Sequence, residues 1–442
     1  MKKGATLLIL IFTLMALIGC SQEKNEKVNK KKIDDSQEIT IALWGLDMRD
    51  GGITAPIGSY TGLFQIKNDI KITYDVINAT SYEEYIEKLN TRLYTNNGPD
   101  LIFFSRGRSP KLYTDKGVGI DVNERLENID KIYDGLKRDK MYYVPIGIFK
   151  PGMILNKGLL EELNIEEPDV NWTIKGYLNI KKQWLKDNPI EFNIIEYEDI
   201  VTKPLYNLDI IDGSNKKVNL NSSKVRNFLV SAKNKIFSED YILNEDYDYY
   251  YNMSLNIGSN EYLGQFEKID NNQQNILRIL RGPNILKLKD QELKNDKFLI
   301  LPNVYDGDIT TFGFMVNKKG KNIDLALKYI DGLLNDGNQK KIYEDQLYYY
   351  YPVNQEVEKE VVKIDKEKGV NERFIKMREV ILDKLKNEKI DYMGEERKIE
   401  IMYKNIEKDL FYLIFTDKEY NEKELEGELK KLEDKYNLIL NE

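Results

Sequence analysis

The segment Gly98-Pro99-Asp100-Leu101-Ile102-Phe103-Phe104 joins a turn to a run of four large apolar residues. Gly and Pro interrupt regular structure, and a short apolar run predicts a buried strand. Upstream, residues 39–44 (ITIALW) and 70–77 (IKITYDVI) predict two more strands, and residues 81–93 predict an amphipathic helix. Strands that alternate with helices in this way predict an α/β sheet.

The same alternation continues further along the chain. Its expected strands are 142–147, 151–156, 298–302 and 311–316, and its expected helices are 158–163, 323–334 with Asn322 as cap, and 425–440. Between the first two strands, Gly51, Gly52 and Pro56 predict irregular backbone. Residues 170–297 have a mainly helical pattern with irregular loops.

The first twenty residues predict export. Lys2 and Lys3 precede an apolar run, residues 7–18, that closes at Leu17-Ile18-Gly19-Cys20. This order describes a signal peptide, and the run is too short to span a bilayer. The ending resembles a bacterial lipobox, in which Cys20 would be lipidated and hold the protein on the membrane. The alternative is an ordinary signal peptide with a chance cysteine, although Cys20 is the only cysteine in the chain.

Residues 21–36 (SQEKNEKVNKKKIDDS) contain no aromatic residue and few apolar ones, so they predict a flexible tether. The remaining ~400 residues exceed what one hydrophobic core usually organises, and this favours two lobes. The net charge of -8 makes nucleic-acid binding an unfavoured function.

The chain contains no histidine. This absence excludes Ser-His-Asp and Cys-His catalysis as well as histidine-ligated metals. Carboxylate-only chemistry, as in glycoside hydrolysis, stays open, but no motif singles out a pair of carboxylates. We therefore expect no catalytic residue, no metal and no cofactor.

Several segments occur in an order that resembles the family 1 extracellular solute-binding proteins. The similar segments are 97–102 (NGPDLI), 142–145 (YYVP), 154–160 (ILNKGLL), 171–173 (NWT), 320–326 (GKNIDLA), 336–339 (DGNQ) and 351–354 (YPVN). Three features depart from the family pattern: the loop at 45–49, the inverted Trp172-Thr173, and a missing Gly-Ala-Met segment. The resemblance covers most of the mature chain.

This resemblance implies a two-lobe α/β fold of the periplasmic-binding-protein type, with a hinge and a cleft between the lobes. On this template lobe one comprises 37–146 and 301–335, and lobe two comprises 147–300 and 336–442. The chain would cross between lobes near Ile146-Gly147, Leu301-Pro302 and Asn335-Asp336. Hinges of this kind absorb the backbone change as such proteins close.

Side chains at the carboxyl ends of sheet strands project into the crevice of α/β folds. Trp44 ends the first strand and is a candidate stacking platform, and Asp47 follows in the loop. The other candidate ligand contacts are Ser105, Arg106, Phe149, Tyr251, Thr311, Phe312 and Tyr351. Each has a structural alternative, such as core packing for the aromatic residues or a surface ion pair for Arg106.

The function that this resemblance implies is delivery of a small solute to an ABC importer. Its expected partners are a sugar or oligosaccharide, the permease subunits and the membrane, with the protein a monomer on the outer face of a Gram-positive cytoplasmic membrane. Peptides, polyols, phosphoesters and polyamines stay open as ligands, since three Trp are few for a carbohydrate cleft. Two other functions stay open: a receptor of the same fold for sensing or adhesion, and a carboxylate-only glycan-processing enzyme.

Overall fold

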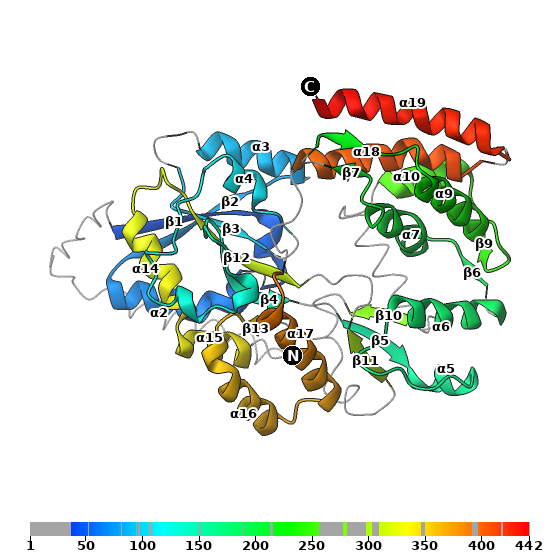
Figure 1. The fold of residues 1–442 in the computed structure, drawn as a ribbon. Helices are drawn as coiled ribbons and strands as arrows, with labels where there is room; N and C mark the ends of the chain where they lie inside the picture. Colours follow the sequence, from blue (N-terminus) through cyan, green and yellow to red (C-terminus); the bar gives the residue numbers. More distant parts are fainter. Residues whose placement is uncertain are drawn as a thin grey trace, which may run out of the picture. The chain divides into compact units, whose positions relative to one another are not determined.

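A computed structural model gives the fold (Figure 1). It describes residues 37–51, 53–80, 82–93, 95, 98–105, 108–149, 152–187, 189–212, 215–255, 277–280, 298–302, 309–345, 350–390, 397–416 and 419–441. Cys20 and the tether at 21–36 lie outside these residues, as does Arg106. Two hydrophobic clusters organise the described chain.

A six-stranded sheet forms the centre of the first cluster, in the order β13-β4-β12-β3-β1-β2. Its strands are β1 (Glu38–Trp44), β2 (Lys71–Ile77), β3 (Leu101–Phe104), β4 (Val144–Phe149), β12 (Thr310–Val316) and β13 (Tyr351–Pro352). Strand β1 runs parallel to both neighbours, whereas β12 is antiparallel to β3 and β4. The carboxyl ends of β1, β2 and β3 therefore lie at one edge of the sheet.

The helices of the first cluster come from two separate parts of the chain, residues 54–115 and 323–387. They are α2 (Thr54–Asn68), α3 (Tyr82–Leu93), α4 (Lys111–Asp115), α14 (Ile323–Leu334), α15 (Asp336–Asp345), α16 (Glu358–Lys368) and α17 (Glu372–Asn387). Short 3-10 turns occur at η2 (Gly45–Gly51), η3 (Ile129–Lys131), η4 (Asp134–Leu136) and η6 (Gln355–Val357).

A three-stranded sheet, β10-β5-β11, belongs to the second part of the chain. Its strands are β5 (Gly152–Asn156), β10 (Leu277–Leu280) and β11 (Phe298–Pro302), and two small ladders pair β6 (Ile190–Glu191) with β9 (Tyr241–Ile242) and β7 (Ile211–Asp212) with β8 (Lys217–Val218). The helices are α5 (Lys157–Glu162), α6 (Ile174–Asp187), α7 (Ile194–Tyr197), α8 (Lys203–Tyr206), α9 (Ser223–Ile236), α10 (Tyr247–Leu255), α18 (Arg397–Ile414) and α19 (Glu422–Asn441), with a π-helical turn η5 (Glu198–Thr202) between α7 and α8.

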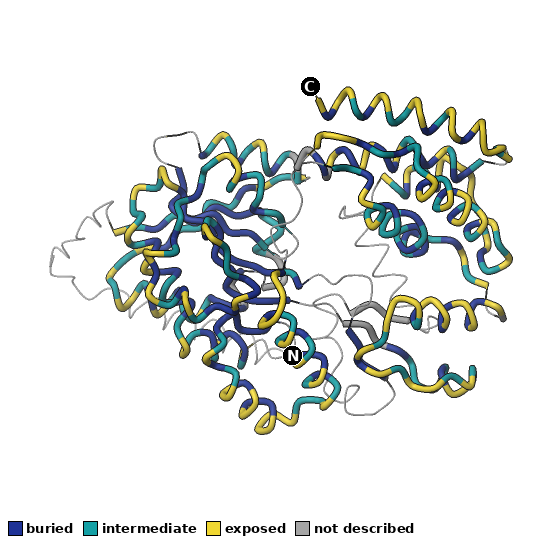
Figure 2. The backbone as a smooth tube through the Cα atoms, viewed as in Figure 1, coloured by how far each residue is buried: buried dark blue, intermediate teal, exposed yellow. Residues whose placement is uncertain are grey.

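Burial follows the sequence pattern of each element (Figure 2). The apolar run of β3 is buried throughout, whereas α19 buries only Leu425, Leu429, Tyr436 and Leu440. Each fully buried Leu, Ile or Phe side chain contributes roughly 1.5–3 kcal/mol. None of the helices in the described ranges is both long and apolar enough to cross a membrane.

Asp100 connects three segments at the start of β3. Its side chain accepts hydrogen bonds from the backbone N–H of Thr40 in β1 (2.9 Å) and of Asn322 before α14 (2.8 Å). Asp100 is buried, so these donors compensate the desolvation of its carboxylate. The Gly-Pro-Asp segment that resembled the family therefore serves the architecture of the sheet.

The structure confirms the predicted strands and helices named above, with bounds that differ by up to three residues. The prediction for residues 51–56 was wrong, because residues 54–68 form α2. Pro56 lies in the first turn of this helix, where the missing N–H costs no intrahelical hydrogen bond. Asn322 precedes α14, but its side chain makes no capping hydrogen bond; it donates to the backbone oxygen of Glu38 (2.7 Å).

The hydrophobic clusters differ from the predicted lobe boundaries. Residues of α15, β13, α16 and α17 belong to the first cluster, although 336–442 was expected in lobe two. Strand β13 pairs with β4, and Gln339 in α15 donates to the backbone oxygen of Ile146 (3.0 Å), so this segment is built into the first sheet. The chain passes to the second cluster after α17, and not at Asn335-Asp336.

The first change of hydrophobic cluster along the chain follows the first predicted crossing, near Ile146-Gly147, by a few residues. Gly147 is inside β4, where an added Cβ would lie 2.0 Å from the ring of Phe312. A glycine is therefore needed here for packing between β4 and β12. The chain leaves the first cluster after Phe149 and enters the second in β5, and it returns between Pro302 and Ile309.

Candidate functional site

An aromatic group lies at the carboxyl edge of β1, β2 and β3. Trp44 ends β1, and its ring centroid lies 5.8 Å from those of Tyr82 and Tyr85, which begin α3. The Trp44 Nε1–H donates to the backbone oxygen of Ala79, just after β2 (3.1 Å). This hydrogen bond fixes the ring plane, since a buried indole N–H needs an acceptor.

Arg108 lies against this group. Its guanidinium carbon is 4.3 Å from the centroid of Trp44 and 4.5 Å from that of Tyr82. Its backbone N–H donates to the backbone oxygen of Ser105 at the end of β3 (3.1 Å). Contact with two aromatic rings restrains the guanidinium plane and leaves the N–H donors at its edge for other partners.

Asp47 supplies a carboxylate beside this guanidinium. It lies in η2, directly after β1, and its side chain makes hydrogen bonds with the side chain of Ser105 and the backbone of Trp44. Burial raises the pKa of Asp47, while these hydrogen bonds and the positive charge of Arg108 act to lower it. Donors and acceptors thus stand side by side against aromatic rings, as recognition of a polyhydroxylated ligand requires.

Three predicted site residues, Trp44, Asp47 and Ser105, are therefore brought together. The predicted role of Trp44 as an open stacking platform is corrected: the indole is 5% exposed and is packed with Tyr85 and Arg108. Sequence reasoning missed Arg108. The run Ser105-Arg106-Gly107-Arg108 offered two arginines after β3, and the prediction took the first, which lies outside the described residues.

A second set of predicted residues lies in the first sheet itself. Phe149 ends β4, and Thr311 shares a hydrogen bond with the hydroxyl of Tyr143 (3.0 Å). Phe312 is 1% exposed, and its ring lies 4.5 Å from that of Tyr350. In this conformation Phe312 packs in the core and leaves no surface for a ligand, contrary to its predicted role.

The two tyrosine choices lie in different surroundings. Tyr351 is buried in β13 and stacks with Tyr343 at 6.4 Å, so it also packs as a core residue here. Tyr251 lies in α10 and contacts Phe411 and Tyr412 of α18 at 5.2 Å each. Both tyrosines pack against other aromatic rings, and the described contacts do not bring either of them to Trp44.

A buried carboxyl with a raised pKa bears on the enzymatic alternative. Glu407 of α18 is 7% exposed and accepts a hydrogen bond from the hydroxyl of Thr202 (2.6 Å). Burial raises the pKa of Glu407 to about 7, and the charge of Glu198 acts in the same direction. The carboxyl is buried and hydrogen-bonded to a side chain of the π-helical turn, and we assign it a structural role.

Replacing Glu407 by glutamine should flatten the pH dependence of stability. An acid whose folded pKa is raised stabilises the fold below its ordinary value of 4.5, and that contribution is lost as the pH rises towards 7. We expect the variant to exceed the wild type in free energy of unfolding at pH 8 by about 1–3 kcal/mol, with little difference at pH 4. Urea unfolding measures this, with the exposed Glu239→Gln as control. An unchanged pH dependence in Glu407→Gln would contradict the assignment.

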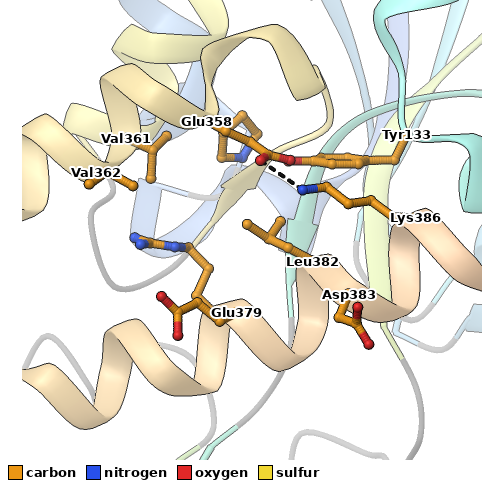
Figure 3. Close-up of a pocket in the computed structure, with 10 residues that line it drawn as sticks. Tyr133, Glu358, Val361, Val362, Glu379, Leu382, Asp383 and Lys386 are labelled. Carbon is orange, nitrogen blue, oxygen red and sulfur yellow. Dashed lines mark hydrogen bonds and ion pairs between the residues drawn. The ribbon is translucent and has the colours of Figure 1, made fainter.

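A separate hollow lies between α16 and α17 (Figure 3), with a volume of about 310 Å³. Val361, Val362 and Leu382 form its apolar side. At its rim Lys386 pairs with Glu358 (2.8 Å), which also accepts from the hydroxyl of Tyr133 (2.8 Å). No predicted ligand contact lines this hollow, and two of its charged residues, Lys386 and Glu358, pair with each other.

A metal site has no support among the described residues, where no cluster of three or more acidic residues, cysteines or histidines is suitably placed. The group at the carboxyl edge, comprising Trp44, Asp47, Tyr82, Tyr85, Ser105 and Arg108, is therefore the strongest candidate site. We call it the β1–β3 edge site.

Comparison with known proteins agrees with the resemblance in the sequence. Residues 51–193 match the family described as bacterial extracellular solute-binding protein. No curated protein sequence matches the chain.

Solved structures share the fold. A maltose-bound MalE3 from T. maritima has a TM-score of 0.60 at 13% identity and covers 91% of this chain and 99% of its own. An ABC substrate-binding protein from Listeria monocytogenes in complex with cycloalternan has a TM-score of 0.57 at 16% identity. The match covers 91% of this chain and 99% of that protein. A solute-binding protein from Agrobacterium radiobacter in complex with ribitol has a TM-score of 0.59 at 13% identity. The match covers 92% of this chain and 99% of that protein. The predicted family resemblance and the two-lobe α/β fold class are thus confirmed.

Proposed function

We propose that this solute-binding protein captures a sugar or oligosaccharide outside the cytoplasmic membrane and passes it to an ABC importer. The observation that carries the proposal is the β1–β3 edge site, where Arg108 and Asp47 offer donors and an acceptor beside aromatic rings. The similar structures named above hold maltose, cycloalternan and ribitol, which are all rich in hydroxyl groups.

The proposed mechanism is a shift between an open and a closed arrangement of the two lobes. A ligand that contacts both lobes favours the closed state by its difference in affinity for the two states. The β1–β3 edge site would supply the contacts of lobe one, with Arg108 donating to adjacent hydroxyls in a fixed fork. The permease subunits would then recognise the closed state.

A thermal-shift screen tests the ligand class. We expect one sugar, oligosaccharide or polyol to raise the melting temperature, because a ligand at a hundred times its dissociation constant stabilises a protein by about 2.7 kcal/mol. Amines, peptides and phosphoesters belong in the same screen as comparison classes. A shift with one of these, and none with any carbohydrate, would overturn the sugar proposal.

The proposed lipid anchor depends on Cys20 alone, since the chain has no other cysteine. Cys20→Ala should block processing or move the protein from the membrane fraction to the medium, because no acyl chain would remain to hold it. Fractionation of cells followed by immunoblotting measures this, and Ser21→Ala serves as the neighbouring control. Retention of correctly processed Cys20→Ala protein at the membrane would overturn the anchor.

Two alternative functions can be distinguished from transport by measuring solute uptake and product release, which a binding assay does not report. A same-fold receptor for sensing or adhesion would bind the solute equally well, but deleting its gene would leave solute uptake unchanged. A carboxylate-only glycan-processing enzyme would release a product from its ligand, whereas a transport protein returns the ligand intact. We favour transport, and chromatography of the ligand after prolonged incubation tests the enzymatic alternative directly.

A further inference from the structure

The point at which the folded chain begins identifies one edge of the first sheet. Glu38 opens β1, and it lies opposite Lys71, the first residue of β2, with an ion pair between them (3.1 Å). Val316, the last residue of β12, lies opposite Leu101, the first residue of β3. The amino ends of the parallel strands thus share an edge with the end of β12, and Gln37, the first described residue, directly precedes Glu38 at this edge.

This amino edge is rich in exposed lysines. The loop from β12 to α14 carries three of them, and one of these, Lys321, acts electrostatically on Glu38. The set comprises Lys67, Lys71, Lys116, Lys318, Lys319 and Lys321. These six lysines outnumber the five nearby carboxylates, Glu38, Asp69, Asp100, Asp115 and Asp324, of which Asp100 is buried, although the whole chain has a net charge of -8.

Two strongly exposed apolar side chains lie beside this edge. Helix α2 ends at Asn68, and the backbone N–H of Ile70 donates to the backbone oxygen of Gln65, so the last turn of α2 adjoins the start of β2. Ile66 in that turn is 81% exposed, and Leu63 one turn earlier is 67% exposed. Among the described large hydrophobic residues these are the two most exposed.

We propose that this amino edge rests on an anionic lipid surface, with the lysines at the headgroups and Ile66 and Leu63 in the interfacial layer. The inference rests on the proposed lipid anchor, which would attach the chain to the membrane through Cys20. Lysines near an anionic bilayer contribute about 1 kcal/mol each, and exposed apolar side chains on a helix add burial at the headgroup boundary.

The tether makes a weak surface contact sufficient. Seventeen residues separate Cys20 from Gln37, counting Gln37. A flexible segment of this length has a root-mean-square extension of roughly 24 Å. The amino edge would therefore meet the lipid at a high effective concentration, so the anchored protein would occupy the lipid surface more fully than the free protein does.

Dye labelling at single engineered cysteines tests the proposal. The chain from Ser21 to Glu442 contains every described residue and no cysteine, so Ile66→Cys carries one environment-sensitive dye. Leu438→Cys on α19, where the native side chain is 64% exposed, is the matched control. With vesicles of phosphatidylglycerol and phosphatidylcholine we expect a blue shift from position 66 and none from position 438, and no shift at either position with phosphatidylcholine alone.

A charge variant completes the test. Lys318→Gln/Lys319→Gln/Lys321→Gln should raise the lipid concentration for half-maximal shift at least about tenfold. An absent shift at position 66, equal shifts at both positions, or a shift that ignores lipid charge would overturn the proposal. So would a Leu63→Ser/Ile66→Ser variant that binds vesicles as before but loses solute uptake, because that face would then serve a protein partner. The vesicle assay uses unlipidated protein, so its failure is distinct from a failure of the Cys20 fractionation.

Discussion

Arg108→Ala is expected to weaken sugar binding by about 10- to 150-fold. The guanidinium lies against Trp44 and Tyr82 at 4.3 and 4.5 Å, so its donors are oriented before the ligand arrives. Hydrogen bonds that involve a charged group contribute about 1.5–3 kcal/mol, and each 1.4 kcal/mol is a factor of ten in affinity. Isothermal titration with the sugar found by the thermal-shift screen measures the loss.

Two further variants separate orientation from charge. Arg108→Lys keeps the positive charge but loses the planar fork, so we expect an affinity between those of the wild type and Arg108→Ala. Arg125→Ala is the control, because Arg125 is exposed and is not part of the β1–β3 edge site. We expect this variant to bind the sugar with unchanged affinity. If Arg108→Ala binds the sugar with wild-type affinity, the β1–β3 edge site is not the ligand site.

The elements that local sequence determines were predictable. Strand β3 was predicted with its observed bounds because a buried apolar run between a turn and polar residues has few alternative structures. Helix α2 was not predicted, because Gly51, Gly52 and Pro56 are typical of loops. A proline in a first helical turn gives the same local signal as a proline in a turn.

The lobe boundaries were less predictable because they depend on tertiary pairing. Helices α15, α16 and α17 are amphipathic, and nothing in their periodicity states which sheet their apolar sides cover. The pairing of β13 with β4 assigns them to the first cluster, and that pairing involves only Tyr351 and Pro352. A two-residue ladder leaves too weak a sequence signal to be recognised in advance.

The candidate site shows the same limit at the level of side chains. The predicted residues Trp44, Asp47 and Ser105 lie close together, because parallel strands bring their carboxyl ends together. The prediction named Arg106 and did not consider Arg108, and the direction of a side chain in a loop depends on a backbone that the sequence pattern does not specify. Phe312 was misassigned for a related reason: its position before a glycine in β12 gave no indication that it fills the space beside Gly147.

Asp199→Ala is expected to cost about 3–5 kcal/mol in the free energy of unfolding of the second cluster. Asp199 is buried in the π-helical turn, where it contacts the ammonium groups of Lys203 (2.9 Å) and Lys181 (3.2 Å) and accepts a hydrogen bond from the hydroxyl of Tyr177 (3.0 Å). Removing the carboxylate would leave the nearby buried ammonium groups with less opposite charge to offset their loss of hydration. Removing one partner of a buried ion pair typically costs about 3–5 kcal/mol of stability.

The change in unfolding free energy caused by Asp199→Ala should depend on pH differently from the change caused by Glu407→Gln. Burial alone would raise the pKa of Asp199, but the charges of Lys181 and Lys203 hold the pKa at about 2. A carboxyl with a lowered pKa stabilises the fold above its ordinary value of 3.8, and that contribution is lost only as the pH falls towards 2. The stability lost in Asp199→Ala should therefore be constant between pH 5 and pH 8, whereas the stability gained in Glu407→Gln should grow over the same range.

Tryptophan fluorescence during urea unfolding provides a suitable measurement, because the three tryptophans divide between the clusters. Trp172 and Trp184 belong to the second cluster and report the loss, whereas Trp44 belongs to the first. Asp240→Ala is the control, because Asp240 pairs with Lys235 near the surface and such pairs contribute at most about 1 kcal/mol. A loss for Asp199→Ala no larger than that of Asp240→Ala would mean that the buried charges of η5 stabilise the fold no more than a surface pair does.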